Sequence, residues 1–116
     1  MRLGRTEIDE MSSTGWLVQI LLPLYDNAGA RFGEEPFSRT RAELLDRFGG
    51  VTAYQQAPAR GLWKTDEGDV AKDDLAVFEV MTPQLDHPWW ETYRRELERR
   101  FSQETIVIRA LKHDLL

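Results

Sequence analysis

Three polar side chains of complementary chemistry interrupt apolar stretches of this chain. Gln19, Glu79 and Arg109 each stand among Val, Ile, Leu, Ala or Phe residues. An amide, a carboxylate and a guanidinium in apolar surroundings can bind a polar ligand group or stabilise charge that develops on a substrate. The same groups can instead satisfy one another beneath a second molecule, because a buried charge needs a partner. Both interpretations stay open, and a one-residue shift of any strand would separate the three.

Four bulky, partly polar residues are further candidates, because they fall near strand ends or in loops, where sites are often built: Tyr25, Tyr54, Trp63 and His87. We expect His87 to be the only histidine near the sheet. It can act as a general base near neutral pH, or it can simply be the residue that starts a helix before Pro88. Trp63 can line the mouth of a pocket or cover the edge of the core. With the first three residues, these four form our predicted ligand-binding set, and no residue is assigned as catalytic.

The residue types that are missing limit the chemistry further. The chain has no cysteine and two histidines. Thiolate nucleophiles, disulfides and thiolate metal sites are therefore excluded, and no histidine spacing typical of a metal site occurs. No glycine-rich phosphate loop and no Gly-x-Ser-x-Gly motif is present. We expect neither a metal nor a cofactor.

Charge and hydropathy argue against two classes of partner. The net charge is −5, from 15 Lys and Arg against 20 Asp and Glu, and it repels nucleic-acid phosphates. No apolar run approaches the roughly 18 residues that span a bilayer, and residues 1–14 have no apolar core that would make them a secretory signal. We therefore expect a soluble, cytoplasmic protein that binds neither nucleic acid nor membrane.

The strands that must position the candidate residues are apolar on both faces. In residues 16–22, 75–81 and 106–111, the even-numbered and the odd-numbered positions are both mainly apolar. Side chains alternate across a strand, and a sheet with one solvated face should alternate cleanly between apolar and polar residues. Helices can cover only one face, so we expect a partner or a ligand on the other.

The order of the elements indicates the fold class. Turn residues and periodicity predict strands at 16–24, 51–57, 74–82 and 105–111, and helices at 36–48 and 88–101. Gly49 is expected to cap the first helix, and Asp86 or His87 the second. The order β-α-β-β-α-β predicts an α+β ferredoxin-like two-layer sandwich. Its antiparallel sheet would have the strand order 4-1-3-2, with two helices on one face. Residues 1–14 would form a flexible lead-in, and residues 15–116 a single domain.

The two predicted helices each have an apolar stripe. In the first helix it consists of Phe37, Leu44, Leu45 and Phe48, and in the second of Trp90, Tyr93 and Leu97. On the solvated face of the second helix, residues four apart form the expected ion pairs Glu91–Arg95, Arg94–Glu98 and Glu96–Arg100.

Three segments carry a resemblance to known proteins: Gly-Leu-Trp-Lys at 61–64, the Asp-Glu-Gly turn at 66–68 and Val-Phe-Glu-Val-Met at 77–81. With them the chain, over about residues 16–111, resembles small bacterial proteins of unknown function with a ferredoxin-like fold. It is more distantly similar to dimeric α/β-barrel proteins, in which two such sheets pack face to face. The resemblance implies a homodimer formed through the sheet face.

Three functions remain open at this point. The leading one is a homodimeric protein that is non-catalytic or binds a small molecule. The second is a cofactor-independent enzyme of the dimeric α/β-barrel type, similar to a monooxygenase or an isomerase. The third is a protein-interaction adaptor, which would show a contiguous exposed apolar patch near Trp63 or Trp89.

Overall fold

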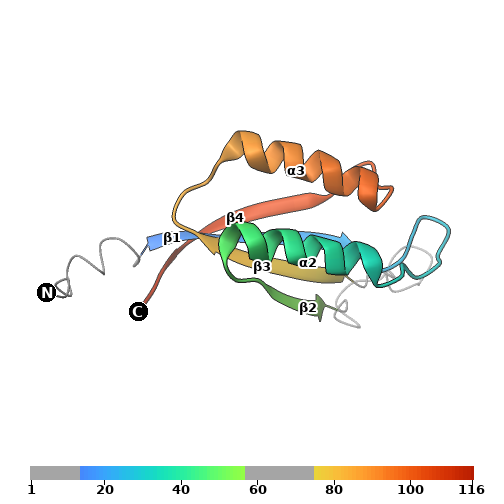
Figure 1. Ribbon diagram of the computed structural model, residues 1–116, viewed down its shortest axis with the longest axis horizontal. Helices are drawn as coiled ribbons and strands as arrows, with labels where there is room; N and C mark the ends of the chain where they lie inside the picture. Colours follow the sequence, from blue (N-terminus) through green and yellow to red (C-terminus); the bar gives the residue numbers. More distant parts are fainter. Residues whose placement is uncertain (1–13, 57–74) are drawn as a thin grey trace, which may run out of the picture.

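The computed structural model of the chain describes residues 14–56 and 75–116 (Figure 1). Residues 1–13 of the expected lead-in lie outside the described residues. So do residues 57–74, with Trp63 and the expected hairpin tip. In chain order the elements are β1 (Thr14–Pro23), α2 (Glu35–Phe48), β2 (Thr52–Gln56), β3 (Leu75–Thr82), α3 (His87–Arg100) and β4 (Val107–Asp114).

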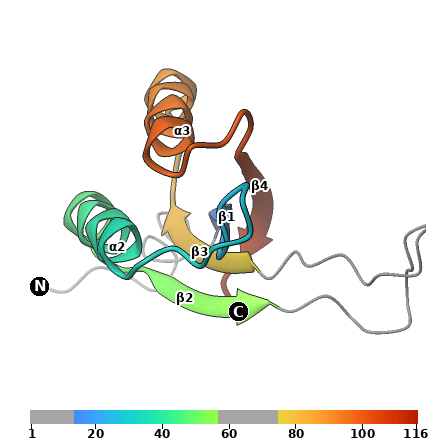
Figure 2. The same cartoon turned by 90° about the vertical axis from the view of Figure 1, so that its right-hand side faces the viewer.

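The four strands form one antiparallel sheet in the order β2-β3-β1-β4. This is the predicted order read from the opposite edge, and Figure 2 shows both helices on the same side of the sheet. The predicted α+β ferredoxin-like architecture is therefore confirmed. Strand β4 departs most from its predicted bounds, because it continues to Asp114. Thr14 pairs with Asp114, so β1 and β4 extend together beyond the predicted ends.

The helices begin and end at the predicted signals. Asp86 caps α3 by accepting a hydrogen bond from the backbone N–H of Trp89 at 3.1 Å, and His87 is the first residue of the helix. Gly49 ends α2 in the left-handed conformation, with φ of 80°. Neither helix in the described residues is long and apolar enough to cross a membrane.

The core lies between the helices and one face of the sheet. The strands contribute Val18, Ile20, Leu22, Phe78 and Val80, and the helices and the turn after α3 contribute Phe37, Leu44, Trp90, Tyr93, Leu97 and Phe101. The predicted stripe of α3 is therefore buried. In α2, however, Leu45 is 51% exposed and Thr40 is buried instead. Successive helical residues point about 100° apart, so Leu44 and Leu45 cannot share one narrow stripe.

The opposite face of the sheet, called the open face below, is covered by neither helix. It comprises alternate residues of the strands: Leu17, Gln19, Leu21, Tyr54, Val77, Glu79, Met81, Val107, Arg109, Leu111 and His113. Four of its large apolar or aromatic members are substantially exposed: Met81 at 57%, Val107 at 49%, Leu111 at 47% and Tyr54 at 42%. Val77 is buried, and Leu17 and Leu21 are half-buried. The open face thus presents large apolar side chains to water.

Candidate functional site

A line of four hydrogen-bonded side chains, one from each strand, crosses the open face. We call Tyr54, Glu79, Gln19 and Arg109 the polar row. The hydroxyl of Tyr54 donates to Glu79 Oε2 at 2.9 Å. Gln19 Nε2 donates to the same oxygen at 2.6 Å, and Arg109 Nε donates to Gln19 Oε1 at 2.7 Å. The row therefore runs without a break from one edge of the sheet to the other.

The strand register explains why these residues meet. Gln19 on β1 is the direct partner of Glu79 on β3 and of Arg109 on β4. Directly opposed residues have their Cβ atoms about 4.5–5.5 Å apart, and a diagonal neighbour lies within reach of a long side chain. Tyr54 on β2 is opposite Val77, so it reaches Glu79 along such a diagonal. The predicted sharing of one face by Gln19, Glu79 and Arg109 holds, and Tyr54 joins them.

The amide of Gln19 links a cation to an anion without letting them touch. A carboxamide donates from its nitrogen and accepts at its oxygen, so Gln19 can bond to both neighbours at once. Among the described residues, Glu79 and Arg109 form no direct ion pair. Glu79 Oε1 and the terminal nitrogens of Arg109 also have no hydrogen-bond partner there. The row therefore keeps hydrogen-bonding capacity at both charged groups.

The hydrogen bond between Tyr54 and Glu79 also affects proton binding. It raises the pKa of the Tyr54 phenol above its ordinary value of 10.0, because the phenol proton is held by a carboxylate. Tyr54 is thus a neutral donor near neutral pH. The open face can bind a donor or cationic group at Glu79, and an acceptor or anionic group at Arg109.

His113 is a residue of the open face that the sequence reasoning missed. It pairs with Gly15, and an ideal Cβ on Gly15 would lie 3.5 Å from the imidazole Nε2 and 3.0 Å from the carbonyl oxygen of Thr82. Both ring nitrogens are buried without a hydrogen-bond partner. Beside the ring is a hollow of about 200 Å³ that Met81, Pro83 and Leu115 also line. A glycine in a strand signals such a close approach.

The other predicted residues lie elsewhere. The expectation that His87 is the only histidine near the sheet is wrong, because His113 lies within β4, whereas His87 is an exposed residue at the start of α3. Tyr25 is an exposed loop residue that bridges to Arg31, whose guanidinium carbon lies 5.8 Å from the centre of its ring. The described part of the chain contains no group of three or more His, Asp and Glu that could hold a metal ion.

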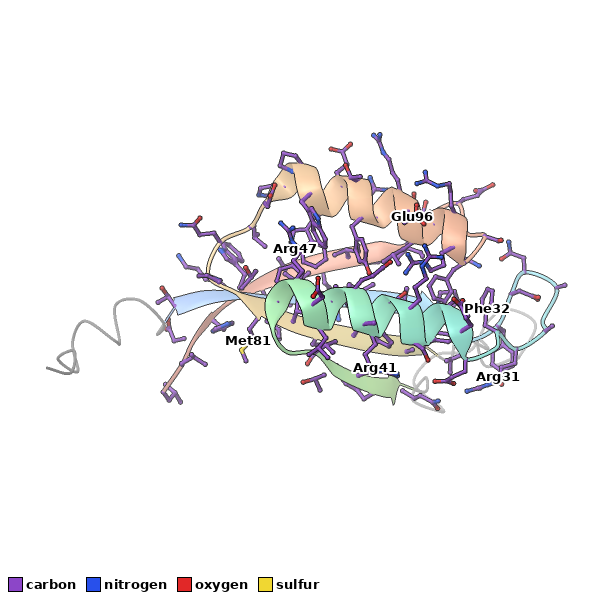
Figure 3. All side chains as sticks on the ribbon, viewed as in Figure 1. Arg31, Phe32, Arg41, Arg47, Met81 and Glu96 are labelled. Atoms are coloured by element: carbon purple, nitrogen blue, oxygen red, sulfur yellow. The ribbon has the colours of Figure 1, made fainter. Side chains whose placement is uncertain are left out.

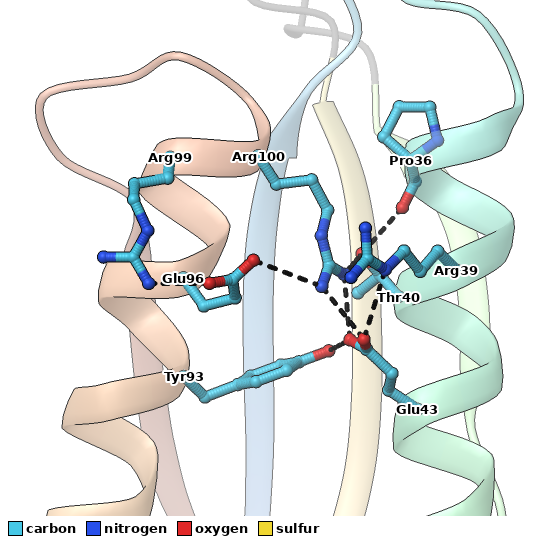
Figure 4. Close-up of polar contacts among 8 residues, drawn as sticks. All are labelled: Pro36, Arg39, Thr40, Glu43, Tyr93, Glu96, Arg99 and Arg100. Atoms are coloured by element: carbon cyan, nitrogen blue, oxygen red, sulfur yellow. Dashed lines mark hydrogen bonds and ion pairs between the residues drawn. The ribbon is translucent and has the colours of Figure 1, made fainter.

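A second polar cluster joins the two helices and was not predicted. This helix cluster consists of Thr40, Glu43, Tyr93 and Arg100 (Figure 4). The two terminal nitrogens of Arg100 each donate to one oxygen of Glu43 at 2.9 Å, and the hydroxyl of Tyr93 donates to Glu43 Oε1 at 2.9 Å. Arg100 also donates to the hydroxyl of Thr40 at 2.8 Å.

The environment of the helix cluster shifts two pKa values in opposite directions. Burial, together with the hydrogen bond to Glu43, raises the pKa of Tyr93. Burial alone would raise the pKa of Glu43 as well, but the hydrogen bonds from Arg100 and Tyr93 outweigh it and lower that pKa. The expected solvated pair of Arg100 with Glu96 is secondary: it spans 3.7 Å, and the Arg100 side chain is 6% exposed. The cluster is a packed connection between α2 and α3.

Trp89 does not form the exposed patch that an adaptor would need. Its ring is half-buried and stacks on Tyr93 with centroids 4.8 Å apart. The guanidinium carbon of Arg47 lies 4.1 Å from the centre of the indole. Trp89 is thus held between α2 and α3 rather than offered to a partner.

Comparison with known proteins shows the fold alone. No family model matches the chain, and no curated protein matches it either. Among solved structures it is similar to a phage SAM lyase in complex with S-methyl-5'-thioadenosine, with a TM-score of 0.54 and 14% identity over 99% of this chain and 88% of that chain. The methylated RPA0582 protein aligns over 99% of this chain and 93% of its own at 15% identity, but the TM-score of 0.36 is too low to indicate a shared fold. The resemblance to bacterial proteins of unknown function and to dimeric α/β-barrel proteins stays a prediction.

Proposed function

We propose that this chain is a small-molecule-binding protein that forms a homodimer through its open face, with the polar row at the centre of the ligand site. One observation carries the proposal. Four hydrogen-bonded side chains cross a sheet face whose surrounding apolar residues, Met81, Val107 and Leu111, are exposed. Large apolar patches on a single chain are typical of interaction sites.

The charges of the polar row favour a second copy as the partner. The row carries Glu79 on one side of Gln19 and Arg109 on the other. A two-fold axis parallel to β1, placed between two such sheets, would set Glu79 of one copy opposite the partner's Arg109. The surface is thus self-complementary, as an isologous interface requires. A ligand with a donor at one end and an acceptor at the other could replace these contacts between the copies.

Sedimentation velocity at micromolar concentration tests the dimer. The wild type is expected to sediment as a dimer. Leu111→Lys is expected to sediment as a monomer, because it places a charge on the open face. Leu45→Lys is the matched control, since Leu45 is a similarly exposed leucine on the outside of α2. A monomeric wild type, or a Leu111→Lys variant that remains a dimer, would contradict the proposal.

Ligand binding is tested separately with S-methyl-5'-thioadenosine, the molecule bound to the structural neighbour. Isothermal titration calorimetry of the wild type should show saturable binding. Glu79→Gln and Arg109→Gln should each weaken it by about tenfold, as expected when one charge-assisted hydrogen bond is lost. Equal affinity in the wild type and both variants would show that the polar row does not contact the probe, and would contradict the proposed site.

A cofactor-independent enzyme is the second candidate, and the half-buried carboxylate of Glu79 favours it. SAM carries a positively charged sulfonium group, which a carboxylate on a partly apolar surface would bind. Incubation with SAM, followed by chromatography for S-methyl-5'-thioadenosine, tests a lyase of the kind found in the structural neighbour. Product formation by the wild type and its loss in Glu79→Gln would favour catalysis over binding alone. If the amount of product does not exceed the uncatalysed background, the lyase activity is contradicted and the binding function remains as the proposal.

A further inference from the structure

A separate pocket lies on the side of the sheet that the helices cover, at the edge formed by β2. It has a volume of about 220 Å³. This edge pocket is lined by residues of α2, β2, β3 and the loop before α2, among them Arg31, Glu34, Phe37, Arg41, Gln55 and Phe78. Phe37 and Phe78 are buried, whereas the four polar residues are exposed or stand at the rim. The pocket therefore has an apolar floor and a polar opening.

Two arginines at this pocket differ from the others in the described residues. Arg39, Arg47, Arg94, Arg95, Arg99 and Arg100 all form ion pairs. Arg109 bonds to Gln19 in the polar row. In the part of the chain that the structure describes, only Arg31 and Arg41 have neither an ion pair nor a side-chain hydrogen bond. Both line the same pocket, Arg31 from the loop before α2 and Arg41 from α2, so the pocket is bordered by two arginines that no described carboxylate pairs with.

The apolar floor suits a flat molecule. The guanidinium carbon of Arg41 lies 5.7 Å from the centre of the Phe78 ring. Figure 3 shows Arg41 extending from α2 toward β2, and Arg31 near the start of the same helix. Phe78 is buried beneath Arg41, so a planar ligand would lie against Phe78 in place of this guanidinium, with its charged group at the opening. Guanidinium groups bind carboxylates through paired, charge-assisted hydrogen bonds.

The loop that carries Arg31 is already fixed. Asp26 Oδ1 accepts hydrogen bonds from the backbone N–H groups of Ala28 and Ala30, both at 2.9 Å. Phe32 packs edge-on against Phe101 with ring centroids 5.3 Å apart. The wall of the pocket thus needs little ordering when a ligand binds, and this lowers the cost of binding.

We propose that the edge pocket binds a small aromatic carboxylate, with its ring on Phe78 and its carboxylate between Arg31 and Arg41. Tyr54 of the polar row also borders this pocket, but Gln19, Glu79 and Arg109 do not line it and lie on the opposite face of the sheet. Glu34 also borders the pocket and repels an anion, so it limits the affinity. Arg31 and Arg41 attract the carboxylate, whereas Glu34 repels it. Neutralising either arginine should therefore weaken binding, and neutralising Glu34 should strengthen it.

Fluorescence titration of the full chain tests this with 2-naphthoate as the probe and 2-naphthylmethanol as its uncharged match. The wild type should bind 2-naphthoate saturably, and at least about tenfold more tightly than the alcohol. Arg41→Gln should weaken 2-naphthoate binding by about tenfold, and Arg31→Gln by a similar factor. Glu34→Gln should tighten it several-fold. Arg95→Gln, a charge change on the exposed side of α3, should leave it unchanged.

Three results would overturn the proposal: no saturable binding of 2-naphthoate, equal affinity for acid and alcohol, or wild-type affinity in Arg41→Gln. Leu111→Lys separates this site from the open face. If that variant loses 2-naphthoate binding while Arg41→Gln keeps it, the probe sits on the open face and the edge pocket is not its site. If Leu111→Lys is a monomer and still binds the probe, both proposals stand.

Discussion

The polar row and the helix cluster contain nearly the same types of side chain, but these side chains are bonded differently in the two regions. Each contains a tyrosine, a glutamate and an arginine, and in each the tyrosine hydroxyl donates to the glutamate. In the helix cluster Arg100 bonds directly to both oxygens of Glu43. In the polar row Gln19 stands between Glu79 and Arg109. Apart from Arg100 Nε, which is buried without a hydrogen-bond partner, the charged groups of the helix cluster bond to one another. The polar row keeps unused donors and acceptors on an exposed face.

Burial separates the two regions as clearly as bonding does. Arg100 is covered by the two helices, so the loss of its partners would leave a charge without compensation. Arg109 is exposed on an open face, and water can replace any contact that it loses. We conclude that the helix cluster contributes to folding, while the polar row is available to a ligand or a second copy. Four predictions test this distinction.

Removal of the buried cation should have the largest effect on stability. Arg100→Ala removes the bidentate contact to Glu43 and the hydrogen bond to the hydroxyl of Thr40, so the free energy of unfolding should fall by about 2–3 kcal/mol. Arg99→Ala is the control, because the neighbouring Arg99 side chain is 69% exposed and should change stability by less than about 0.5 kcal/mol. Urea unfolding measures both. If Arg100→Ala and Arg99→Ala were equally stable, the helix cluster would not be stabilising the fold, and the distinction between the two regions would be wrong.

Acid should abolish the contribution of Glu43. Its pKa in the folded protein lies below the ordinary value of 4.5, so its stabilising effect is complete above that pH and is lost as the pH falls through the folded-state pKa. The difference in unfolding free energy between the wild type and Glu43→Gln should be largest near neutral pH. It should shrink progressively below pH 4.5. A difference that stays constant down to about pH 3 would be inconsistent with an ionised Glu43 in the helix cluster.

Interruption of the polar row should cost less stability than interruption of the helix cluster. Gln19→Ala removes two hydrogen bonds on a half-solvated face, and we expect a loss of about 1 kcal/mol in the monomeric Leu111→Lys background. That background keeps dimerisation from contributing to the measured unfolding. A loss as large as that of Arg100→Ala would mean that the row supports the fold in the same way as the helix cluster.

Tyr54→Phe should have the smallest effect and one specific signature. The melting temperature should match that of Tyr25→Phe, because both phenols are exposed. In an alkaline absorbance titration, Tyr54→Phe should lose a phenol that ionises above pH 10.0, since the hydrogen bond to Glu79 raises its pKa. Loss of a phenol that ionises at or below pH 10.0 would show that the hydrogen bond does not persist in solution.

The polar row was accessible from the sequence because strands have a simple geometry. Alternation placed Gln19, Glu79 and Arg109 on one face, and the strand order made β1 the neighbour of β3 and β4. Tyr54 was expected near a strand end but was not linked to the other three, because a diagonal contact depends on the pairing of β2 with β3. His113 was missed because β4 continues beyond its apolar stretch.

The helix cluster was not accessible in the same way. Glu43 and Arg100 lie on different helices, and their contact depends on how far apart the helices pack and how each is rotated about its axis. Charge spacing along α3 alone favours the pair of Arg100 with Glu96, which the structure shows as the longer contact. Local periodicity identifies which residues share a face of one helix, but it does not identify which residue on another helix they meet.

The position of β1 in the sheet has a consequence for biosynthesis. Gln19 bonds to residues 60 and 90 positions further along the chain, and β1 pairs only with β3 and β4. A ribosome therefore releases an apolar strand long before either neighbour has been made. Until then β1 is an unpaired apolar segment that is exposed to aggregation, of the kind that chaperones protect. We expect slow folding, dominated by contacts between distant parts of the chain, with β1 as its most aggregation-prone segment before β3 arrives.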